Sequence, residues 1–87
     1  MKINEQKLKE EIITLAKRRG PDKTICPSEA ARAVDSDNWR TLMEDIRAAA
    51  QSLQEKGFIT VEQNGEPVDL NEVSGPVRLR INPGQSA

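Results

Sequence analysis

Arginine and glutamine side chains at helical spacing are the part of this chain best suited to contact another molecule. Arg40, Arg47 and Gln51 are separated by two turns and then one turn of a helix, so they share a face. Arginine can bind phosphates or guanine edges, and glutamine can read adenine. The pattern indicates a nucleic-acid interface, to which the upstream residues Arg32 and Lys23 would add positive charge.

Local charge weakens this interpretation. The stretch 38–56 holds three basic and three acidic residues, which cancel. The segment from Glu62 to Pro76 has four acidic residues and no lysine or arginine, so it would repel a phosphate backbone. With a net charge of −1, the composition favours neither an acidic nor a basic partner.

Catalytic and metal-binding chemistry has little support in the sequence. Histidine is absent and there is one cysteine, which removes histidine-dependent triads and Cys/His zinc sites. Ser28 with Lys23 resembles a Ser–Lys pair, but a serine at this position more often caps a helix. Asp35, Asp37 and Asn38 resemble the opening of a calcium loop that lacks its glycine and distal glutamate. We therefore expect no enzyme activity, no cofactor and no metal.

Two single residues admit both a functional and a structural interpretation. Cys26 precedes Pro27 near a predicted helix start, where a thiol can be reactive. The chain has no second cysteine to resolve an oxidised thiol, so a small buried residue is the better interpretation. Trp39 could stack on a base or a sugar, but it shares an apolar stripe with Leu42 and Met43. We expect Trp39 to anchor the core and leave the role of Cys26 open.

The elements that must position these side chains are three helices, predicted at about 4–19, 27–34 and 38–56. Apolar residues recur at helical spacing in the first helix, which Gly20 and the following proline end. The third helix shows the strongest period, and its outward face is predicted to hold the polar residues Arg40, Glu44, Arg47, Gln51 and Gln54.

Two strands are predicted after the helices, at about 58–63 and 77–81, because β-branched residues and strict alternation mark these stretches. A long connection that includes the turn signal Asn64-Gly65 separates them, and a short strand could also form at 24–25. Three helices followed by an antiparallel hairpin predict an α+β winged helix-turn-helix. Residues 1–81 would form a single domain, and 82–87 a disordered tail.

Length and composition fit a small intracellular domain. Eighty-seven residues suit one domain with a small core. No apolar run reaches the roughly 18–20 residues that span a bilayer, and the polar N-terminus is no secretory signal. Two aromatic residues are too few for a platform that stacks several bases. We expect a cytoplasmic protein that is not in a membrane.

Four segments of the chain resemble a family of bacterial proteins, domain-of-unknown-function family 3253. They are KTICPSEAARAV, DNWRTLMEDIRAAAQSL, KGFITVEQNGEPVD and GPVRLR, and the resemblance extends from Ile12 to Arg80. The resemblance implies a winged helix, a bacterial origin and an undefined biochemical role. It supplies no catalytic or ligand-binding residues.

Two functions therefore remain open. The first is binding of double-stranded DNA through the third helix, with Arg40, Arg47, Gln51, Arg32 and Lys23 as candidate contacts. The second is a protein-interaction module that uses the winged helix as a scaffold and binds no DNA. The acidic stretch 62–76 and the charge-neutral third helix favour the second, and the order of the elements favours the first. The sequence does not define the oligomeric state.

Overall fold

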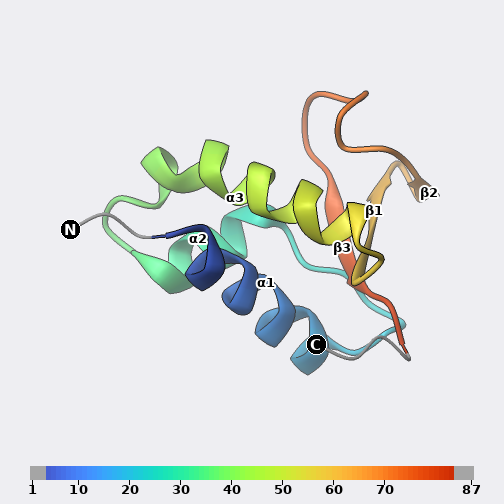
Figure 1. The fold of residues 1–87 in the computed structure, drawn as a ribbon, viewed down its shortest axis with the longest axis horizontal. Coiled ribbons are helices and arrows are strands. Elements are labelled where there is room, and N and C mark those ends of the chain that lie inside the picture. The colour runs from blue at the N-terminus through green and yellow to red at the C-terminus, as the bar shows by residue number, and fades with distance from the viewer. Residues whose placement is uncertain (1–3, 84–87) are drawn as a thin grey trace.

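The chain forms three helices followed by a small antiparallel sheet (Figure 1). The computed structural model describes residues 4–83. The elements are α1 (Glu5–Arg19), α2 (Pro27–Val34), α3 (Trp39–Glu55), β1 (Ile59–Gln63), β2 (Glu66–Pro67) and β3 (Arg78–Ile81). This α+β arrangement confirms the predicted fold class and is consistent with a winged helix. The predicted helices and the two longer strands agree with the structure to within one residue at each end.

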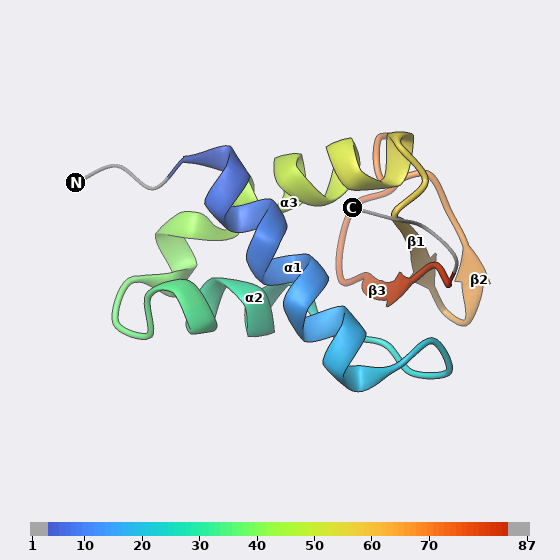
Figure 2. The same cartoon turned by 60° about the horizontal axis from the view of Figure 1, so that its bottom comes forward.

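Helix α1 begins and ends as its sequence predicts. The Asn4 side chain accepts a hydrogen bond from the Lys7 amide at 2.8 Å, which satisfies one of the amides that every helix start leaves without a partner. At the other end Gly20 adopts a φ of 94°, and its amide donates to the Ala16 carbonyl. Figure 2 shows α1 lying across α2 and α3. Helix α1 packs against both of these helices, and its buried residues are Leu8, Ile12 and Ala16.

A tight turn joins α2 to α3. Asn38 is the cap residue of α3, but its side chain accepts no capping hydrogen bond. The Asp35 carboxylate instead accepts from the amides of Asp37 and Asn38, at 3.1 and 3.2 Å. On α2, Ala30 and Ala31 are fully buried, and such small side chains let α3 approach closely. The turn therefore brings the end of α2 next to the beginning of α3.

The end of α3 is a Schellman motif centred on a glycine. Gly57 has a φ of 84°, and its amide donates to the Gln54 carbonyl at 3.0 Å. The next amide, of Phe58, donates to the Leu53 carbonyl at 3.0 Å. These two bonds satisfy helix carbonyls and turn the chain directly into β1.

The sheet has three strands in the order β2-β1-β3, all antiparallel. Strand β2 lies inside the connection predicted between the two longer strands, and it pairs with β1 across the Asn64-Gly65 turn. Both turn residues have positive φ, 56° and 83°, as a two-residue hairpin requires. The short strand expected at 24–25 is an isolated bridge, in which Ile25 and Leu79 exchange hydrogen bonds of 2.8 Å.

One hydrophobic core joins the three helices to one face of the sheet. Its larger fully buried members are Leu8, Ile12, Ile25, Ile46, Ile59, Val61 and Leu79. Of the predicted tail, Asn82 is held by its amide, which donates to the Phe58 carbonyl at 3.0 Å, and residues 84–87 lie outside the described part. Within residues 4–83, no helix has the length and apolarity needed to cross a bilayer.

Candidate nucleic-acid interface

Two arginines from different helices lie over one tryptophan ring at the α2–α3 turn. Arg32 is in the last turn of α2, and Arg40 is the second residue of α3. Their guanidinium carbons lie 4.4 and 4.5 Å from the centroid of the Trp39 ring. Such cation–π contacts are worth about 0.5–1 kcal/mol each at exposed sites. We call Arg32 and Arg40 the turn arginines.

The turn arginines keep their hydrogen-bond donors available. Both side chains belong to exposed residues, whereas Trp39 is partly buried against the core. No ion pair within residues 4–83 involves either arginine. The first turn of α3 contains no acidic residue, but the Asp35 carboxylate accepts from the amides of Asp37 and Asn38 just before it, so negative charge also lies at this end of the helix. The arrangement places two exposed guanidinium groups at one indole ring.

Trp39 takes the structural role expected for it and also contacts the turn arginines. The ring packs against the core, as predicted, and its position fixes the turn arginines. Their proximity depends on how α2 crosses α3, which the spacing of residues in the sequence does not show.

Arg47 is placed away from this pair and has other partners. Its guanidinium donates to the carbonyl of Gly75 at 3.2 Å and lies 3.5 Å from that of Val73. Both carbonyls belong to the segment 68–76, which connects β2 to β3. Arg47 is therefore committed to holding this segment beside α3.

Gln54 holds the same segment, and sequence analysis missed this role. Its amide donates to the Val68 carbonyl at 2.6 Å and accepts from the Leu70 amide at 3.0 Å. Leu70 is 6% exposed and belongs to the core. The signal in the sequence was the spacing of Val68, Leu70 and Val73, three apolar residues in a segment predicted to be a loop. We call residues 68–76 the strap.

Gln51 and Lys23 lie apart from the turn arginines. The Gln51 amide donates to the Glu55 carboxylate, one turn further along α3, at 3.2 Å. Lys23 is exposed in the connection before α2, so the length of α2 separates it from Arg32. Of the five predicted contacts, the structure brings together Arg32 and Arg40. The part that any of the five takes in binding stays a prediction.

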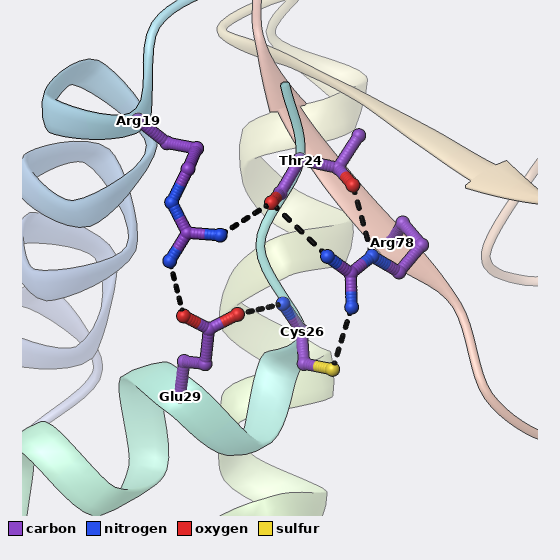
Figure 3. Close-up of polar contacts among 5 residues, drawn as sticks. All are labelled: Arg19, Thr24, Cys26, Glu29 and Arg78. Carbon is purple, nitrogen blue, oxygen red and sulfur yellow. Dashed lines mark hydrogen bonds and ion pairs between the residues drawn. The ribbon is translucent and has the colours of Figure 1, made fainter.

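A second group of arginines lies where α1, α2 and β3 meet, and here every guanidinium has protein partners (Figure 3). Arg19 donates to the Thr24 carbonyl at 3.0 Å and pairs with the Glu29 carboxylate. Arg78 donates to the hydroxyl and carbonyl of Thr24, at 2.9 and 3.1 Å, and to the Cys26 sulfur at 3.0 Å. Cys26 is partly buried at the start of α2.

Arg80 completes this second group. It forms two hydrogen bonds with the Glu62 carboxylate, at 2.7 and 3.2 Å, and one with the Pro21 carbonyl at 2.8 Å. These bonds link β3 to β1 and to the connection between α1 and α2. We call Arg19, Arg78 and Arg80 the sheet-side arginines.

The carboxylates of this region have shifted pKa values. The hydrogen bonds from Arg80 lower the pKa of Glu62, against a smaller opposing effect of burial. Burial alone would raise the pKa of Glu29. The Cys26 amide and the Arg19 guanidinium together outweigh burial, so the pKa of Glu29 is also lowered. Both carboxylates are thus stabilised in their charged form.

The remaining surface of α3 and the strap is acidic. Glu44, Asp45 and Glu55 are exposed on α3, and Asp69 and Glu72 are exposed on the strap. Lys56, the cap residue at the C-terminal end of α3, is also exposed, so α3 carries positive charge at both ends. In the part of the chain that the structure describes, no group of His, Cys, Asp and Glu side chains could hold a metal ion.

The chain forms a small α+β domain that is consistent with a winged helix, with Arg32 and Arg40 at the turn between α2 and α3. The chain belongs to the family described as protein of unknown function (DUF3253), whose family model matches residues 5–82. No curated protein matches the chain.

Proposed function

We propose that this domain is a small DNA-binding module, without enzyme activity, that contacts phosphates of the duplex through the turn arginines. The observation that supports the proposal is the pair of guanidinium groups over Trp39, 4.4 and 4.5 Å from its ring. Arginine is the side chain best matched to phosphate, because its planar fork can donate two parallel hydrogen bonds.

The expected affinity is modest and depends steeply on salt. Each phosphate contact contributes about 0.9 to the slope of log K against log salt, so two contacts give a slope of about −2. Raising the salt from about 50 to about 200 mM would then weaken binding roughly tenfold. The acidic strap lowers the affinity further, because its carboxylates repel phosphate.

Fluorescence anisotropy with a mixed-sequence duplex at low salt tests the proposal. We expect the double variant Arg32→Ala, Arg40→Ala to lose about tenfold or more in affinity. The matched control is Lys17→Ala, Arg18→Ala, which removes the same charge from exposed positions at the end of α1. The control should stay within about twofold of the wild type, because distant exposed charges are screened.

Two results would overturn the proposal. One is no binding at tens of micromolar protein and low salt. The other is an equal loss in both double variants, which would show that binding follows net charge and not the turn arginines.

The alternative is a protein-interaction module that binds no DNA. The exposed carboxylates Glu66, Asp69 and Glu72 favour it, and a partner would have to present a basic segment to them. A partner captured from the native cell by the wild type, but not by Glu66→Gln, Glu72→Gln, would support it if the pure protein bound no duplex. A monomer in sedimentation that captures no partner and binds DNA would exclude it.

A further inference from the structure

We infer that the module binds duplex DNA through its backbone and does not select a base sequence. This inference rests on the proposed function and names the substrate class of the same site. It reverses the expectation that the third helix reads bases.

Three side chains of α3 that could read base edges, Arg47, Gln51 and Gln54, are already engaged. Arg47 donates to two carbonyls of the strap, and Gln54 both donates to the strap and accepts from it. Gln51 donates to Glu55. If one of these three side chains read a base, it would have to break its bond within the protein, and the Gln54 pair also positions the buried Leu70.

The strap also restricts how far α3 could enter a groove. A helix with its side chains is about 10–12 Å across, and the major groove is about 12 Å wide. The strap is tied to α3 at Arg47 and Gln54, which lie two turns apart on one flank of the helix. With the strap packed along this flank, α3 and the strap together are wider than the major groove. The C-terminal half of α3 therefore cannot lie deep in the groove.

Charge opposes the same insertion. The outward face of α3 presents Glu44 and Glu55, and Asp45 is also exposed. Phosphates line both sides of the groove, so each carboxylate that approached the bases would pass close to them and be repelled.

The turn arginines remain outside these restrictions. They lie at the N-terminal end of α3, beyond the positions that hold the strap. The Trp39 ring already carries both guanidinium groups and packs on the core, so it offers no stacking platform for an unpaired base. This end can offer DNA two exposed guanidinium groups, whose planar forks match phosphate.

The test measures affinity for several duplexes of about 20 bp that share one base composition but have permuted sequences, at one low salt concentration. We expect dissociation constants within about threefold of one another. Arg40→Ala should weaken all duplexes by the same factor, as the loss of a phosphate contact does. Gln51→Ala, a change on the outward face of α3, should alter no affinity by more than about twofold.

The outcomes separate this inference from the proposed function. No binding to any duplex overturns both. Binding in which one permuted sequence is preferred about tenfold or more overturns the inference alone, because one or two correct base contacts give that much discrimination. A loss of affinity in Gln51→Ala that depends on the duplex sequence also overturns it.

Discussion

The two groups of arginines differ in what their guanidinium groups do. The sheet-side arginines donate to carboxylates, carbonyls, a hydroxyl and a thiol of their own chain. The turn arginines contact an indole ring, which orients a guanidinium group by its face and leaves the N–H donors unused. The same residue type thus joins the fold together at one end of α2 and presents charge to solvent at the other.

A count of basic residues therefore does not show which arginines have partners within the protein. Of the three sheet-side arginines, Arg19 and Arg80 are paired with Glu29 and Glu62, whereas Arg78 donates to uncharged groups of Thr24 and Cys26.

The largest effect on stability is expected from Arg78→Ala. The change leaves the carbonyl and hydroxyl of Thr24 and the sulfur of Cys26 without this donor. With a net value near 1 kcal/mol for a typical hydrogen bond, we expect a loss of about 1–2 kcal/mol in urea denaturation. Arg78→Lys should recover only part of the loss, because an ammonium cannot reproduce the planar fork. Arg18→Ala serves as the exposed control, and an equal loss in that variant would contradict the structural role of Arg78.

A smaller effect is expected when the sheet-side ion pairs are titrated with acid. The pKa of Glu62 is lowered in the fold from an ordinary value of 4.5, so its stabilising contribution is complete above about pH 4.5. The free energy of unfolding should therefore fall as the pH drops through the lower, folded-state pKa. Glu62→Gln should have a shallower dependence over this range, measured by urea denaturation at a series of pH values. Identical slopes in the two proteins would contradict the assignment.

The smallest effect on stability is expected at the turn arginines. Each cation–π contact is exposed, so Arg32→Ala and Arg40→Ala should each cost about 0.5 kcal/mol. Repeating both changes in a Trp39→Leu background should reduce the cost of each, because the ring they contact is gone. If replacing a turn arginine by alanine lowered the free energy of unfolding as much as Arg78→Ala does, that arginine would also hold the fold together. The contrast between the two groups would then be wrong.

The helices were predictable because their local signals agree. The periodic apolar residues, the Asn4 cap and the glycines at positions 20 and 57 all specify the same boundaries. Strand β2 was not predicted because it has only two residues and one of them is a proline. The pairing of β2 with β1 depends on the Asn64-Gly65 turn between them. The sequence indicates this turn, but it does not indicate how many residues pair after it.

The candidate site was predictable as a set of residue types and not as a geometry. Arg47 and Gln54 were expected on an open helix face because helical spacing places them beside Arg40 and Gln51. The strap that occupies them is separated from α3 by the whole β1–β2 hairpin, so helical spacing gives no sign of it. The pairing of Arg32 with Arg40 likewise depends on a helix crossing, which local patterns do not encode.

Strand β2 also limits how this protein can associate with itself. The Val68 amide donates to the Val61 carbonyl at 2.8 Å, so the backbone of Val68 faces β1. Because successive residues of a strand direct their backbone groups to opposite sides, the backbone of the neighbouring Pro67 faces the outer edge of the sheet. That edge has no N–H to donate at Pro67, and the exposed Glu66 adds a charge beside it. On the opposite edge, Ile25 already bonds to Leu79. The sheet thus gives another chain little to extend by strand addition, which protects so small a domain from edge-to-edge aggregation.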